Sequence, residues 1–275
     1  MPGGPKDSTR TRVVPVFNEL LRRNGAETEW INKLLSLASD TTASLDRPKL
    51  GVLHEHRWGE LEKKLAPPLP LLEWLLVNAD VTPLGDNFKR DDTTELRRKL
   101  LIEKCETTKS KAKSFLHQNS SHQKQWYCFE GESQPDVYLE TDNTIIVIEG
   151  KRTEASITVG TKWMRCRHQM IRHLDCVYDI KNGKRVFGIF IVEGDGGADS
   201  TAVPERWRAA ANSTKNDANV FNSLPHRNPK ERSEIVSSYL GITTWQIVCD
   251  AFKIPWTSLP DTIDTKHNLE MDSLE

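Results

Sequence analysis

Residues 134–154, QPDVYLETDNTIIVIEGKRTE, contain three charged side chains whose types and spacing suit catalysis: Asp136, Glu149 and Lys151. Asp136 opens a short stretch of alternating apolar and polar residues, and Glu149 and Lys151 follow a β-branched run. Two such stretches joined by a polar turn predict a β-hairpin. Because side chains alternate along a strand, Glu149 and Lys151 share one face, and the hairpin returns Asp136 beside them.

These three side chains suit a metal-assisted reaction. Charge buried without a partner is costly, and a divalent metal would relieve the crowding of the two carboxylates. The carboxylates of Asp136 and Glu149 and the carbonyl of Gly150 offer the hard oxygens that Mg²⁺ prefers. Lys151 would then orient or help to deprotonate a metal-activated water and stabilise phosphate charge. The simpler interpretation is a surface hairpin that carries a Glu–Lys ion pair.

The sequence Pro135-Asp136, followed in the next strand by Glu149-Gly150-Lys151, resembles the signature of the PD-(D/E)xK nuclease superfamily. Members of this superfamily have the restriction-endonuclease-like fold. The resemblance implies a nuclease that hydrolyses phosphodiester bonds of DNA with Mg²⁺, for which Mn²⁺ would substitute. Asp136, Glu149 and Gly150 would hold the metal, and Asp136, Glu149 and Lys151 would be catalytic. The resemblance covers residues 126–193 and, less closely, residues 56–65.

A helix with a basic flank is predicted over residues 161–179. Before Asp175 the flank contains no acidic residue, and we predict that it contacts nucleic-acid phosphates, although a solvated face is the alternative. Its contact residues would be Lys162, Arg165, His168, Arg172 and His173. Gln169 and His173 lie one turn apart. In some branches of the superfamily this helix presents a Gln-x-x-x-Tyr pair to the active site, so Gln169 is a further catalytic candidate, whereas His173 replaces the Tyr.

An additional metal ligand is predicted in residues 56–65, HRWGELEKKL, which have helical apolar spacing. Gly59-Glu60-Leu61-Glu62 is similar to a Gly-x-x-Glu pattern in an N-terminal core helix of the superfamily, whose Glu adds a metal contact. Glu62 is therefore a candidate ligand, and an ordinary surface helix is the alternative. Glu130 and Glu132 are close enough to Asp136 in sequence to be further candidates.

The remaining patterns predict the elements that position these residues. Strands are expected at 126–130 and 185–193, and the order becomes α–β–β–β–α–β, the core order of the superfamily. The expected fold class is therefore α/β, with a restriction-endonuclease-like core: a mixed central sheet flanked by helices, plus helical additions at both ends. Further helices are expected at 14–23, 29–37, 70–77, 91–116, 204–211, 229–240 and 243–252.

These elements suggest a domain organisation. Residues 1–12 are expected to be disordered and 13–53 to form a helical lead-in that packs on the core or builds a homodimer contact. Residues 54–200 would form the nuclease-like core, with a helical insertion at about 66–124. Residues 201–259 would form a helical annex and residues 260–275 a flexible tail.

Composition limits the functional class. The chain has 275 residues, of which 28% are charged, and its net charge of −1 does not by itself indicate nucleic acid. Five cysteines without a C-x-x-C pair suggest reduced thiols in a cytoplasmic compartment. No membrane-spanning run is present, so no membrane partner is expected.

Two functions other than catalysis are also compatible with the sequence. The chain could be a non-catalytic DNA-binding or interaction module that retains the nuclease fold, or an interaction protein with a chance motif. Within the nuclease reading, roles in restriction, defence or repair are all compatible with the motif.

Overall fold

The computed structural model describes residues 7–38, 50–78, 105–117, 130–154, 167–195 and 201–260. Within these ranges a five-stranded mixed sheet is flanked by helices, which makes the architecture α/β. Its strands are β1 (Leu53–Trp58), β2 (Val137–Thr141), β3 (Thr144–Lys151), β4 (Arg185–Val192) and β5 (Tyr239–Thr244). They lie side by side in chain order, with β1, β2 and β3 antiparallel and β3, β4 and β5 parallel.

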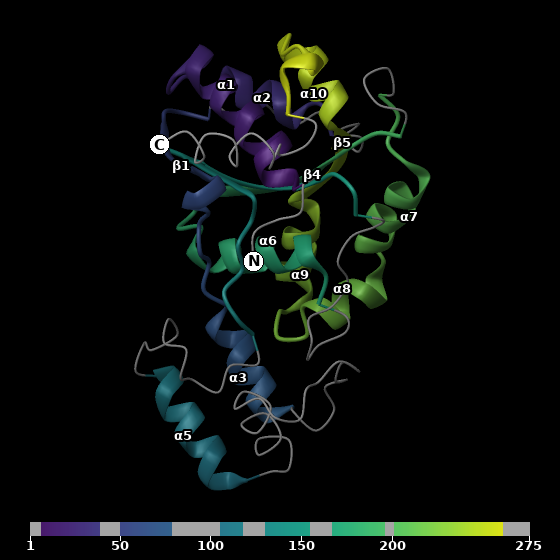
Figure 1. Cartoon of the computed structure of the whole chain (residues 1–275). Coiled ribbons are helices and arrows are strands. Elements are labelled where there is room, and N and C mark those ends of the chain that lie inside the picture. The colour runs from purple at the N-terminus through teal and green to yellow at the C-terminus, as the bar shows by residue number, and fades with distance from the viewer. Residues whose placement is uncertain are drawn as a thin grey trace, which may run out of the picture.

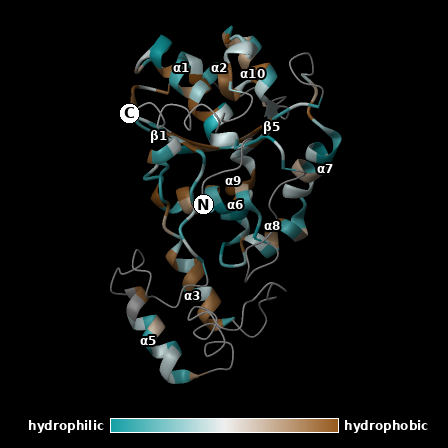
Figure 2. Cartoon of the chain, viewed as in Figure 1, coloured by the Kyte–Doolittle hydropathy of each residue, from teal (hydrophilic) through white to brown (hydrophobic). Residues whose placement is uncertain are grey.

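Helices cover both faces of the sheet (Figure 1). One face packs against α1 (Val14–Asn24), α2 (Glu29–Leu35) and α10 (Trp245–Phe252). The other packs against α6 (Gln169–Ile180), α7 (Glu205–Thr214), α8 (Asp217–Ser223) and α9 (Pro229–Ser237). The central strands β3 and β4 are buried along nearly their whole length, which explains their continuous apolar runs. Figure 2 shows this hydrophobic layer between the two helical layers.

Two glycines allow the helical layers to approach the sheet. A Cβ at Gly150 in β3 would lie 2.7 Å from Val13 Cγ2 and 2.8 Å from a ring carbon of Trp245. A Cβ at Gly188 in β4 would lie 2.6 Å from Met170 Sδ and 3.0 Å from Leu174 Cδ2 on the opposite face. Gly150 therefore faces the α1 and α10 layer, while its neighbours Glu149 and Lys151 face the α6 layer.

The sequence prediction for several elements is confirmed. The hairpin of β2 and β3 forms with its turn before Thr144, and the helices expected near residues 14–23, 29–37 and 70–77 are α1, α2 and α3 (Leu69–Val77). The strand expected at 185–193 is β4. The second half of the helix expected at 91–116 is α5 (Glu106–His117), which packs against α3, away from the sheet layers (Figure 1).

The helix predicted over residues 56–65 is wrong. Residues up to Trp58 belong to β1, which pairs with β2, and a single 3₁₀ turn follows at Gly59–Leu61. Gly59, where this turn begins, has a φ of +67°, which lies outside the right-handed α-helical region. The helical spacing of Trp58, Leu61 and Leu65 was misleading, because Trp58 packs on Phe17 whereas the Leu61 side chain is 65% exposed.

The purely helical C-terminal annex is also wrong, since residues 201–259 contribute β5. The helix predicted at 229–240 is α9, which ends at Ser237, and residues predicted as helix ends form part of the strand instead. β5 is buried throughout and parallel to β4. The strand predicted at 126–130 falls mostly outside the described residues, and Glu130 itself is not in a strand.

The two ends of the described chain meet at the carboxyl end of β4. Arg12 is 1% exposed and binds the carboxylate of Glu193 through Nε at 2.9 Å and Nη2 at 3.2 Å. Its Nη1 donates to the carbonyl of Pro260 at 2.7 Å. Among the described helices, none is both long and apolar enough to cross a membrane.

Candidate active site

The candidate site lies where β2 begins and β3 ends. Asp136 immediately precedes β2, and its Oδ2 accepts a hydrogen bond of 2.7 Å from the backbone amide of Gly150 in β3. The flanking residues of Gly150 point to the face covered by α6, where Lys151 Nζ lies 2.7 Å from Glu149 Oε1. The antiparallel register of the hairpin, in which Val137 pairs with Ile148, places Asp136 beside the end of β3. The structure therefore brings Asp136, Glu149 and Lys151 together.

Two residues of α6 complete the surroundings of Glu149, which is 2% exposed. Gln169 Nε2 donates to Glu149 Oε1 at 2.5 Å, and His173 Nε2 lies 3.0 Å from Glu149 Oε2. Gln169 and His173 are four residues apart and lie on the same side of the helix. The pair predicted from the sequence therefore contacts the Glu149 carboxylate near the end of β3.

The two carboxyl groups have opposite electrostatic environments. Burial acts to raise the pKa of Glu149, but the hydrogen bond and charge of His173, together with the charge of Lys151, hold this pKa below its ordinary value. For Asp136, burial and then the charge of Glu149 raise the pKa well above its ordinary value. Burial acts to lower the pKa of Lys151, but the charges of Glu149 and Asp136 raise it. Lys151 is therefore an ammonium group in this arrangement.

Glu62 lies within electrostatic range of the same group. Burial raises its pKa, and the charges of Glu149 and Asp7 raise it further, while Lys151 opposes them. Glu62 follows the 3₁₀ turn, and the backbone of Leu65 pairs with that of Ser133 through two 2.8 Å hydrogen bonds. The predicted helix is absent, but Glu62 still approaches the site from the end of β1.

The residues predicted to contact nucleic acid differ in where the structure places them. Lys162 and Arg165 lie outside the described residues. His168 is 3% exposed and forms a 2.9 Å hydrogen bond with Thr214 Oγ1, so it belongs to the core and is in no position to contact a ligand. Arg172 forms an ion pair of 2.6 Å with Glu130 and donates to the carbonyls of Gly131 and Glu132.

Sequence reasoning missed a buried ionic cluster beneath this site. Arg167 and Asp175 are both fully buried and form an ion pair of 2.6 Å, and Arg227 binds the second oxygen of Asp175 at 2.8 Å. Burial acts to raise the pKa of Asp175, but the charge of Arg167 holds it well below its ordinary value. No periodic pattern marks these residues, because Arg227 comes from a loop far along the chain. Ser133, which contacts His173, was missed for the same reason.

The site contains carboxylate and carbonyl oxygens, the type of donor atom that Mg²⁺ prefers. Among the described residues, no group of three or more His, Cys, Asp or Glu side chains is arranged to hold a metal. Mg²⁺ characteristically needs only one or two carboxylates because it retains several waters. The charge of Glu149 acts on both Asp136 and Glu62, and the charge of Lys151 opposes it, so three acidic groups share one ammonium group here. The buried Oε1 of Gln169, whose Nε2 donates to Glu149, has no hydrogen-bond partner among the described residues.

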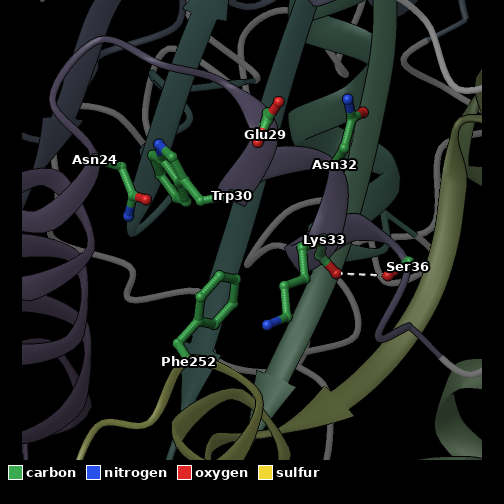
Figure 3. A pocket seen from close by; sticks show the side chains of 7 residues that line it. All are labelled: Asn24, Glu29, Trp30, Asn32, Lys33, Ser36 and Phe252. Atoms are coloured by element: carbon green, nitrogen blue, oxygen red, sulfur yellow. Dashed lines mark hydrogen bonds between the residues drawn. The ribbon is translucent and has the colours of Figure 1, made fainter.

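Two pockets in the described part of the chain lie away from the candidate site. One pocket has a volume of about 580 Å³ and lies between α2 and the end of α10. Figure 3 shows the side chains that line it, Asn24, Glu29, Trp30, Asn32, Lys33, Ser36 and Phe252. A second, of about 370 Å³, lies beside β1 and α1 and includes His56, Trp58 and Leu61. Neither pocket is lined by Asp136, Glu149 or Lys151. The candidate site is therefore identified from the chemistry of its residues and not from a pocket.

Comparisons of the chain with protein-family models, with curated proteins and with solved structures found no match.

Proposed function

We propose that this protein is a metal-dependent nuclease that hydrolyses phosphodiester bonds of DNA, with Mg²⁺ as its metal and Mn²⁺ as a substitute. The observation that carries the proposal is the meeting of Asp136, Glu149 and Lys151 on one face of a buried hairpin. Two carboxylates and an ammonium group at such a place suit the hydrolysis of an anionic ester better than they suit a structural role.

The arrangement of elements supports a restriction-endonuclease-like core. The succession of α1 and α2, then β1, β2 and β3, then α6 and β4 gives the order α–β–β–β–α–β, with α3 and α5 inserted between β1 and β2. This order is the one expected from the resemblance to the PD-(D/E)xK superfamily, although β1 stands in place of the strand predicted at 126–130. The site also lies at the carboxyl end of the parallel strands, where ligands characteristically bind in open α/β sheets.

Each residue of the site would have a distinct role in the reaction. Asp136, Glu149 and the carbonyl of Gly150 would hold the metal, and Glu62 would add a further carboxylate. When bound, Mg²⁺ would supply Lewis-acid activation of a water and neutralise phosphate charge. Lys151, held as an ammonium group, would orient the water and stabilise the negative charge that develops on the phosphate. Gln169 would hold the Glu149 carboxylate and offer its free Oε1 to the reaction centre.

Cleavage of linear, supercoiled and single-stranded DNA in Mg²⁺ or Mn²⁺ tests the proposal. With Lys151→Ala both carboxylates remain, so we expect metal binding to persist while the rate falls by about 10²–10³, the usual cost of one preorganised electrostatic contact. Lys253→Ala is the matched control, because Lys253 is an exposed lysine that also pairs with a nearby carboxylate.

The same assay with a gel-shift in Ca²⁺ separates a nuclease from a binding module. Equal cleavage by the wild type and Lys151→Ala would show that the activity comes from elsewhere. Tight DNA binding by the wild type without cleavage in either metal would favour a non-catalytic module instead.

A further inference from the structure

A chain of hydrogen bonds lies behind the Glu149 carboxylate. Ser133 Oγ lies 2.6 Å from His173 Nδ1, and His173 Nε2 lies 3.0 Å from Glu149 Oε2. Ser133 is 1% exposed, and His173 and Glu149 are each 2% exposed, so water does not compete for these bonds. Neither Ser133 nor His173 has a role in the metal-binding set described above.

The chemistry of the three groups determines the direction of the bonds. An ionised carboxylate only accepts, so His173 must carry its proton on Nε2 to bond with Glu149. The Ser133 hydroxyl can both donate and accept, so it bonds with Nδ1 whichever of the two atoms carries the hydrogen. The Ser133 hydroxyl therefore holds the His173 ring in the orientation in which Nε2 faces Glu149.

The backbone of the loop that carries Ser133 is anchored on both sides. Ser133 pairs with Leu65 through its own amide and carbonyl, each at 2.8 Å. The preceding carbonyls of Gly131 and Glu132 both accept from Arg172, the neighbour of His173 in α6, at 2.8 Å. The Ser133 hydroxyl is thus held against His173 by contacts independent of the hydrogen bond itself.

We propose that Ser133 and His173 are positioning residues that hold the Glu149 carboxylate in one orientation for a divalent cation. This inference rests on the proposed function. Lys151 and Gln169 bind one oxygen of Glu149, and His173 binds the other. An ionised carboxylate has about four lone-pair sites, so three donors leave one for the cation and prevent the group from rotating away. Partners behind a ligand of this kind typically change metal affinity or activity by about 10–100-fold.

Four variants test the proposal by calorimetric titration with Mn²⁺ and by kcat and KM for DNA. Ser133→Ala removes the hydroxyl but keeps the backbone pairing with Leu65. His173→Asn places an amide near the former Nδ1, whereas His173→Gln places an N–H donor near the former Nε2. Thr214→Val is the matched control, because Thr214 also forms a buried hydroxyl–imidazole bond, with His168.

We expect Ser133→Ala and His173→Asn to bind Mn²⁺ about 10–100-fold more weakly and to lose kcat, with KM for DNA little changed. His173→Gln should remain closer to the wild type than His173→Asn, and Thr214→Val should bind Mn²⁺ like the wild type. If Ser133→Ala does not fold, the comparison of Gln and Asn at residue 173 decides the matter.

The outcomes separate this inference from the proposed function. A wild type that binds no Mn²⁺ and cleaves no DNA would overturn both. A wild type that binds and cleaves, with unchanged Mn²⁺ affinity in Ser133→Ala and His173→Asn, would overturn the positioning role alone. Equal losses in His173→Asn and His173→Gln would also overturn it, because they would show that only the packing of the ring matters.

Discussion

At the scale of single residues, the surroundings of Asp136 and Glu149 push the pKa values of two similar carboxyl groups in opposite directions. Such divergence is characteristic of sites that perform acid–base or metal chemistry. Residue type and strand periodicity were enough to predict the shared face of Glu149 and Lys151. They could not predict Ser133, because its contact with His173 depends on how a loop without periodicity lies on α6.

His168 provides a pH-dependent test of the core. Burial, and to a lesser degree the charge of His173, lowers the pKa of His168 from an ordinary 6.5 to about 4. The unfolded chain therefore takes up this proton at higher pH than the folded chain does, and the free energy of unfolding falls as the pH decreases from 6.5 to about 4. At about 1.4 kcal/mol per pKa unit, this fall of the pKa from 6.5 to about 4 corresponds to a loss of about 3–4 kcal/mol at most.

Urea denaturation across this pH range measures the effect. His168→Gln keeps a polar partner for Thr214 but does not titrate, so its unfolding free energy should vary less with pH than that of the wild type. Part of the slope should remain, because burial also lowers the pKa of His226. Identical slopes for the two proteins would contradict the buried, neutral state of His168.

At the scale of elements, the strands that the sequence predicted well are those with strong local patterns. The hairpin and β4 have continuous β-branched or aromatic runs between turn residues. β1 was mistaken for part of a helix because its apolar residues also fit a helical spacing, and pairing with β2 overrides that pattern. β5 was missed because its short run Tyr239–Thr244 lies between two well-patterned helices.

The two sheet glycines give a prediction at this scale. Gly150→Ala should lower the free energy of unfolding by about 1–3 kcal/mol, because a methyl group would collide with the buried Val13 and Trp245. Gly188→Ala should cost less, because its nearest neighbour is the flexible side chain of Met170. Thermal and urea denaturation of both variants provide the measurement. A larger loss for Gly188→Ala would contradict the packing of α10 on β3.

At the scale of the whole molecule, Arg12 connects the beginning of the described chain to the end of β4 and to Pro260. Contacts across 181 residues of sequence are beyond any local pattern, which is why residues 1–12 were predicted to be disordered. That prediction is wrong for the described residues 7–12, since Thr9–Val13 is helical and Arg12 is buried. Arg12→Ala should lower the free energy of unfolding by about 3 kcal/mol, since it breaks a buried ion pair. Glu193 retains Arg152 at 3.0 Å, which limits the loss.

Denaturation of Arg12→Ala beside Arg22→Ala checks this role. Arg22 also pairs with a glutamate, but its side chain is 70% exposed, so its loss should change stability little. Similar effects of the two substitutions would show that Arg12 does not hold the two ends of the described chain together.

The central claim is that Asp136 and Glu149 form one divalent-metal site beside Lys151. Crystals soaked in Mn²⁺ and measured at a wavelength with strong manganese anomalous scattering test it most directly. We predict an anomalous peak within coordination distance of both carboxylates, about 2.0–2.2 Å from their oxygens, and its loss in Asp136→Ala. A wild-type crystal with no peak there, or with a peak that contacts neither Asp136 nor Glu149, would contradict the account.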